Sequence, residues 1–145
     1  MSAMLLSPTD PPAPPPAAPR KPRRRWRDKF REAFRGVKLG VRGHSSFFVH
    51  FFFAALALTT ALVLRCDWQD WCLIMGCIGL VLTAELFNSA IETLFHGLDG
   101  ETKGRVRGCL DIAAGAVLVA SVTAAIVGAV VFTRQILLLL HMYEG

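Results

Sequence analysis

Four polar side chains stand within or beside apolar segments of this sequence, where charge is costly. Glu85, Asn88 and Glu92 follow one another at i, i+3 and i+7, and Asp111 opens the next apolar segment. On a helix of 3.6 residues per turn the first three project from one face and span about 10 Å along the axis. Carboxylates are kept at membrane depth only where they face protein or water. The sequence therefore predicts a polar site inside an apolar protein.

The chemistry of these side chains suits a phosphorylated ligand. Carboxylate and amide oxygens are ligands that Mg²⁺ prefers. A carboxylate displaced toward the bilayer is protonated more readily and can act as a general base. Cations of the polar segment 96–108 can offset phosphate charge. The set fits phosphoryl transfer from a nucleotide to a lipid hydroxyl. A polar seam between helices and an ion pathway stay open as alternatives.

Composition places these residues in a membrane protein. The chain has 145 residues, of which 53% are hydrophobic and 19% charged, whereas a soluble domain has about 25% charged residues. All eight prolines fall within 8–22, and eleven of the sixteen Lys and Arg residues lie within 20–42. An ordinary soluble enzyme and a fully disordered chain are both excluded. The basic cluster adjoins an apolar segment, so we expect a membrane surface as its partner and no nucleic acid.

The amino-terminal part has two sections. Residues 1–22 are rich in proline and basic at their end, which predicts a disordered tail. Residues 23–44 carry Trp26, Phe30 and Phe34 at four-residue spacing among Arg and Lys. That pattern predicts a basic amphipathic helix lying on the membrane surface.

Three apolar segments beyond this helix are long enough to cross a bilayer. Cations are concentrated before the first segment and in 96–108, while the first connection and the carboxyl end have one each. The positive-inside rule then puts the amino terminus and residues 96–108 in the cytoplasm and the carboxyl terminus outside. The final segment is too short to span, and whether it extends the last helix or lies on the surface stays open. The predicted domain covers 23–133, with spans at about 47–64, 71–95 and 110–133 and a short tail at 134–145.

The four cysteines carry no metal-site spacing. Cys72 and Cys77 lie inside an apolar segment and Cys109 at the start of another, where small buried apolar residues are expected. We expect Cys66 alone to be exposed.

Two strings of the sequence resemble a known family. A-E-L-F-N-S-A-I-E-T (84–93) and L-D-I-A-A-G-A-V-L (110–118) are similar to the prokaryotic diacylglycerol kinase and undecaprenol kinase family, as is F-R-x-A-F-R-G-V-K (30–38) to its surface helix. The resemblance covers about residues 30–132. It implies an all-α protein of the cell inner membrane with a surface helix and three transmembrane helices. It also implies a homotrimer whose active sites are shared between neighbouring protomers.

The resemblance also assigns roles to single residues. Glu85 matches the family's proposed base for the lipid hydroxyl, and Asn88 matches the neighbouring active-site amide. Glu92 matches a carboxylate that holds Mg²⁺ on the phosphates of ATP. Asp111 matches an acid at the nucleotide site, and Glu101 falls at a loop acid near the nucleotide. The implied function is ATP-dependent phosphorylation of undecaprenol or diacylglycerol at the cytosolic membrane face.

The sequence departs from the family at two positions. His44 stands where the family has a second metal-binding Glu, and it is a softer, uncharged ligand. Leu110 stands where the family has a nucleotide-site Lys, and Arg107, one turn earlier, can reach the same phosphate. The departures motivate an alternative, in which the chain is a non-catalytic trimeric membrane protein of the same fold with a structural or regulatory role.

Overall fold

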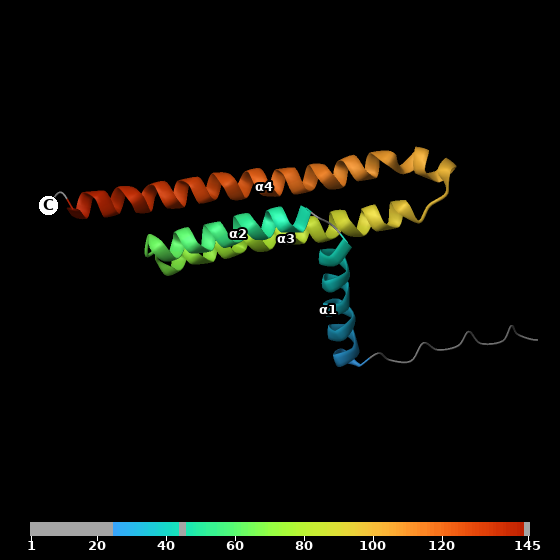
Figure 1. The fold of residues 1–145 in the computed structure, drawn as a ribbon, viewed down its shortest axis with the longest axis horizontal. Helices are drawn as coiled ribbons and strands as arrows, with labels where there is room; N and C mark the ends of the chain where they lie inside the picture. Colours follow the sequence, from blue (N-terminus) through green and yellow to red (C-terminus); the bar gives the residue numbers. More distant parts are fainter. Residues whose placement is uncertain (1–24, 44–45, 144–145) are drawn as a thin grey trace, which may run out of the picture.

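The computed structural model describes residues 25–43 and 46–143 of the protein. Within these residues the chain forms four helices. Helices α2, α3 and α4 run alongside one another, and α1 runs across their direction (Figure 1). The predicted all-α membrane fold with three long apolar helices is confirmed. The predicted tail 1–22 and His44 lie outside the described residues. The helices are α1 (Trp26–Gly43), α2 (Ser46–Val63), α3 (Trp68–His96) and α4 (Gly100–Tyr143).

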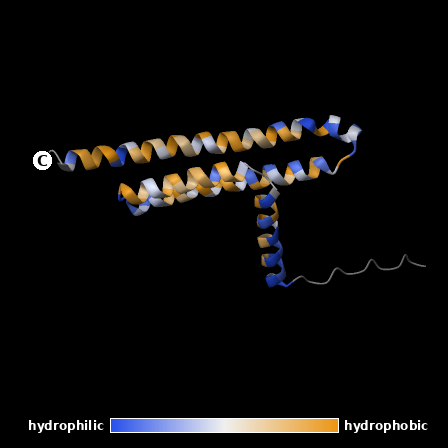
Figure 2. Ribbon diagram, in the orientation of Figure 1, coloured by the Kyte–Doolittle hydropathy of each residue, from blue (hydrophilic) through white to orange (hydrophobic). Residues whose placement is uncertain are grey.

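Helix α2 is apolar on all sides and contains no acidic or basic residue at either end. Its 18 residues give a length of about 27 Å, close to the thickness of a bilayer's hydrocarbon core. A helix that is hydrophobic all round is typical of a membrane span. Figure 2 shows the contrast with α1, which is largely hydrophilic.

Helix α4 begins earlier than the sequence pattern indicates. The polar residues and four glycines of 96–108 indicate a loop before the last span. In the structure the connection between α3 and α4 is short, and α4 starts at Gly100. Asp99 caps it, accepting hydrogen bonds from the backbone N–H groups of Glu101 and Thr102 at 3.1 and 3.0 Å. The bonds from the backbone and the hydroxyl of Thr102 hold the pKa of the Asp99 carboxyl below its usual range. The cations of this segment therefore stand on the first turns of a helix.

The carboxyl-terminal segment takes one of the two forms that the sequence left open. Helix α4 continues through 134–143, so the segment extends the last span rather than lying apart from it. Its 44 residues make α4 about 66 Å long, roughly twice the thickness of the hydrocarbon core. Figure 1 shows the consequence: α4 projects past the α2–α3 turn at one end, and the α3–α4 hairpin projects past α1 at the other.

The α2–α3 turn sets the core at the end of the bundle that lies away from α1 (Figure 1). Arg65 adopts a positive φ of 53°, and the N–H of Cys66 bonds back to the carbonyl of Ala61 at 3.0 Å. This is the Schellman ending of a helix, which brings the residue after the left-handed position onto the last turn. Cys66 is accordingly buried with Ala61, Ile74 and Val131. Burial, with the nearby charges of Asp70 and Asp67, raises the pKa of the Cys66 thiol.

The cysteine prediction is therefore wrong in its placement. Cys66 is buried, Cys77 is half-buried, and Cys72 and Cys109 are exposed at the protein surface. The Schellman turn explains the error, because a turn residue reads as exposed unless its contact with the preceding helix is known.

A polar clamp joins α4 to the α2–α3 turn. The guanidinium of Arg134 lies 3.1 Å from Oδ1 of the buried Asp70 and 3.7 Å from Oδ2 of Asp67. Gln135 donates from Nε2 to the carbonyls of Leu64 and Arg65 at 3.1 and 3.4 Å. These contacts satisfy carbonyls that the end of α2 leaves without helical partners. They fix the register of α4 against the hairpin.

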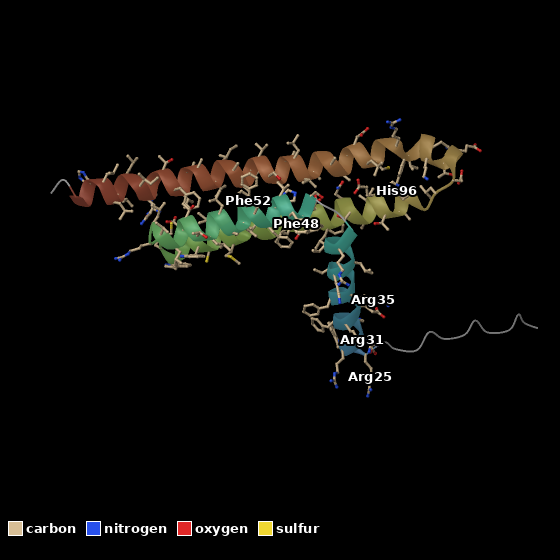
Figure 3. The ribbon with its side chains drawn as sticks, in the orientation of Figure 1. Arg25, Arg31, Arg35, Phe48, Phe52 and His96 are labelled. Carbon is tan, nitrogen blue, oxygen red and sulfur yellow. The ribbon has the colours of Figure 1, made fainter. Side chains whose placement is uncertain are left out.

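The aromatic stripe of α1 is not covered by protein. Trp26, Phe30 and Phe34 are all exposed, and the ammonium of Lys29 lies 5.0 Å from the centroid of the Trp26 ring. Figure 3 shows Arg31 and Arg35 on the same helix and Arg25 directly before its first residue. Apolar rings and cations on one exposed helix suit the headgroup region of an anionic membrane.

Replacing Arg134 with Met tests the clamp. The substitution leaves the carboxylate of Asp70, 3% exposed, without its cation, and Arg134 is itself half-exposed, so water screens part of the pair. We expect the free energy of unfolding to fall by about 1–2 kcal/mol in detergent micelles. Arg31→Met is the matched control, because its pair with Asp28 is solvent-exposed and should be worth less than about 0.5 kcal/mol. Equal losses in the two variants would contradict the clamp.

Candidate functional site

The centre of the candidate site is a buried carboxylate on α3. Glu85 is 2% exposed and faces the beginning of α2. The hydroxyl of Ser46 donates a hydrogen bond to its Oε1, and Nε2 of His50 lies 3.7 Å from its Oε2. A buried carboxylate is costly unless donors compensate its charge. Both of its oxygens are directed at α2.

Ser46 and His50 were not expected at this site. They stand at i and i+4 on α2, so they share one face of that helix. Each can donate a hydrogen bond, and they are close together on a helix that is otherwise almost entirely apolar. This spacing was the available signal. It does not reveal the partner, because the register of α2 against α3 is not encoded in either helix alone.

Asn88 turns toward a different neighbour. It is half-buried and lines a cavity of about 490 Å³ between α3 and α4, together with Phe87, Cys109 and Ile112. Glu85 does not line this cavity. The two side chains are about 60° apart around the helix, which is enough to direct one toward α2 and the other toward α4.

The other predicted residues lie nearer the α3–α4 hairpin. Glu92 is half-buried about two turns beyond Glu85, while Glu101 and Arg107 are exposed on the first turns of α4. Asp111 is exposed and lies about 200° around α4 from Ala113, which is buried against α3. A single protomer therefore does not bring Asp111 to Glu85. Among the described residues no group of three or more His, Cys, Asp and Glu side chains lies close enough to hold a metal ion.

An apolar groove ends beside His50. Its volume is about 600 Å³, and α2, α3 and α4 all contribute to its walls. Small side chains widen it, because they leave space between the helices. His50 is its one strongly polar wall residue among those described, and the wall also includes Ala54, Ala57, Ala124, Ala125 and Gly128.

Helix α1 docks next to the buried carboxylate. Gly40 packs so closely on Leu86 that a Cβ at this position would lie 2.7 Å from its Cδ2 atom. Leu86 is the neighbour of Glu85 in sequence, so this contact places α1 at the level of the site. The glycine allows a close approach here, and a larger residue would have to move the end of the Leu86 side chain.

Comparison with known protein families shows the family of this chain. The model of the family described as prokaryotic diacylglycerol kinase matches residues 31–132. The chain belongs to the prokaryotic diacylglycerol kinase family. The matched range includes most of α1, all of α2 and α3, and α4 as far as Phe132. No curated protein and no solved structure matches the chain. Membership supports a lipid kinase fold in an integral membrane protein.

Substituting Gly40 tests how α1 is held at the site. In Gly40→Ile the added side chain must displace Leu86, so we expect α1 to detach and trypsin to cleave at Lys38 and Arg42 severalfold faster. Gly36→Ile is the matched control, because a Cβ there meets nothing within 4 Å and the change in helix propensity is the same. Equal cleavage rates in the two variants would show that the contact with Leu86 does not position α1.

Proposed function

We propose that this protein phosphorylates the hydroxyl of a membrane lipid, undecaprenol or diacylglycerol, with ATP as the phosphoryl donor. The family match supports a lipid kinase, and the buried carboxylate of Glu85 is the structural observation that most directly supports proton transfer at this site. Deprotonation of an alcohol as it attacks phosphorus requires a base held in a site that excludes bulk water. Glu85 provides the buried negative charge on which such proton transfer depends, at the level of α1.

A purely structural role explains this carboxylate less well. A seam between membrane helices needs donors and acceptors, and neutral Ser, Thr or Asn residues supply them without burying a charge. Glu85 keeps an acidic group where desolvation works against it. We therefore favour catalysis over the non-catalytic alternative and over a polar seam.

We place the hydrocarbon part of the lipid in the groove between α2, α3 and α4. The groove is mostly apolar and ends at His50, beside Glu85. A lipid in this position keeps its chain away from water and brings its hydroxyl to the site. The mostly apolar walls suit either lipid, since apolar contacts distinguish poorly between hydrocarbon chains.

We place the nucleotide at the α3–α4 hairpin. Mg²⁺ bound to ATP commonly needs only one or two protein carboxylates in addition to the phosphates, so the oxygen ligands of Glu92 fit it, with His44 as a second ligand. Bound there, Mg²⁺ would offset charge on the phosphates. Arg107 would also contact phosphate, and Asp111 and Glu101 would contact the rest of the nucleotide.

The exposure of Asp111 favours a site shared between protomers. Because one protomer does not bring Asp111 to Glu85, we propose that the homotrimer completes each site with residues of a neighbour. We also propose that the protein lies in the inner membrane with its amino terminus in the cytoplasm. The cations of α1 and of the first turns of α4 favour this orientation.

Phosphate transfer from ATP to lipid in mixed micelles tests the proposed activity. We expect Glu85→Gln to lower the rate with undecaprenol or diacylglycerol by about 10²–10⁴-fold, the usual contribution of general acid–base catalysis, because the site loses its buried carboxylate. Asp28→Asn, on the exposed part of α1, should stay within about twofold of the unaltered protein. If the unaltered protein and both variants gave only background transfer with each lipid, the kinase proposal would fail.

Mixed trimers test whether sites are shared. Glu85→Gln and Asp111→Asn proteins should each be nearly inactive alone. When the two are combined and allowed to exchange subunits, some sites would receive an intact Glu85 from one protomer and an intact Asp111 from its neighbour. We expect a substantial fraction of activity to return. A mixture as inactive as its components would place both residues in sites formed within one protomer.

A further inference from the structure

Glu85 is poorly placed to meet a lipid hydroxyl directly. It is 2% exposed, Oε1 accepts a hydrogen bond from Ser46, and Oε2 faces the imidazole of His50. The side chain of His50 is more accessible, at 16%, and it forms part of the groove wall, whereas Glu85 does not. A lipid in the groove therefore reaches the imidazole before it reaches the carboxylate.

We propose that His50 takes the proton from the lipid hydroxyl and that Glu85 orients the imidazole and stabilises the imidazolium that forms. The inference rests on the proposed kinase function and identifies the group that touches the substrate. A carboxylate facing Nε2 favours the tautomer that carries its proton on Nε2. Nδ1 is then left as the proton acceptor for the substrate.

The proton transfer balances without any further reactant. Nδ1 of the neutral imidazole accepts the hydroxyl proton while the lipid oxygen forms a bond to the γ-phosphorus of ATP. The bond between that phosphorus and the β,γ-bridging oxygen breaks, and ADP leaves with the electron pair. The imidazolium later releases its proton to water. The products are the phosphorylated lipid, ADP and one proton, and His50 returns to its neutral form.

Ser46 has a supporting role in this arrangement. Its hydroxyl donates to Oε1 of Glu85, which leaves Oε2 as the oxygen that faces the imidazole. A carboxylate held on one oxygen cannot easily turn away from its second partner. The 3.7 Å between Nε2 and Oε2 is longer than a hydrogen bond, and catalytic hydrogen bonds commonly shorten once substrate is bound.

The surroundings of His50 contain few competing groups. From α3, Glu85 faces it and Cys77 lines the same groove. The described residues that α4 contributes to the groove wall are Ser121 and apolar side chains, so α4 adds no titratable group there. Glu85 is accordingly the charged partner available to an imidazolium at this position.

Chemical rescue tests the role of His50 in the full-length protein. His50→Ala should lower the turnover number by about 10²–10⁴-fold. Added imidazole should restore activity as its concentration rises, because the lost side chain leaves space in the groove. The same addition should not restore Glu85→Gln. Thr59→Ala, on an exposed part of α2 outside the groove wall, should keep activity within about twofold and show no response to imidazole.

Two results would overturn the proposal. One is a His50→Ala protein that keeps activity within about threefold. The other is a loss of activity that imidazole does not reverse in a variant whose melting temperature is unchanged, since this would make His50 a positioning residue. If the unaltered protein transferred no phosphate to any lipid, the kinase proposal itself would fail, and with it the role of His50.

A measurement on the protein without substrate tests the contact between His50 and Glu85 independently of phosphate transfer. Nitrogen-15 resonances of the His50 imidazole in detergent should show a protonated Nε2 and an unprotonated Nδ1. Glu85→Gln should shift the tautomer balance away from this state. A proton found mainly on Nδ1 in the unaltered protein would contradict the proposal whatever the rate of phosphate transfer.

Discussion

The arrangement of the helices depends on compensating charge inside a low-dielectric bundle. At the level of α1, the carboxylate of Glu85 is buried and needs polar partners. Ser46 and His50 supply them from α2, and these contacts connect α2 to α3. At the opposite end the carboxylate of Asp70 is also buried, and its ion pair with Arg134 connects α4 to α3. Helix α3 thus supplies both buried carboxylates, and each holds a different neighbouring helix in register.

The apolar contacts between these two polar contacts determine how far apart the helices stand. Ala113 and Ala120 are buried and let α4 approach α3 closely. Between α2 and α4 small residues leave space instead, and the groove results. Association of membrane helices gains little from the hydrophobic effect, since lipid is as apolar as the side chains. Specific polar contacts and close packing therefore decide which helix surfaces meet and which stay open.

Local patterns in the sequence were sufficient for the spans and the surface helix, because apolar length and aromatic spacing are properties of single segments. They placed the start of α4 too late, because the glycines there do not indicate a helix, although Asp99 caps one. They also predicted an exposed Cys66, whose burial depends on the turn that follows α2. Glu85 and Asn88 lie on one helix, about 60° apart around its axis. Their separate neighbours, and the contact of Glu85 with His50, depend on the register between helices, which no single segment contains.

In the proposed reaction, the site of proton transfer and the site of phosphate binding lie at different levels along α3. Glu85 stands at the level of α1, and Glu92 about 10 Å farther toward the hairpin. The lipid hydroxyl would arrive from the groove and the nucleotide from the water beyond α1, so the two reactants approach α3 from opposite sides of one boundary. Gly40 matters here because its contact with Leu86 sets the depth of α1, and thus of that boundary, relative to both carboxylates. The surface helix then does more than anchor the protein: its depth would decide whether hydroxyl and phosphate meet.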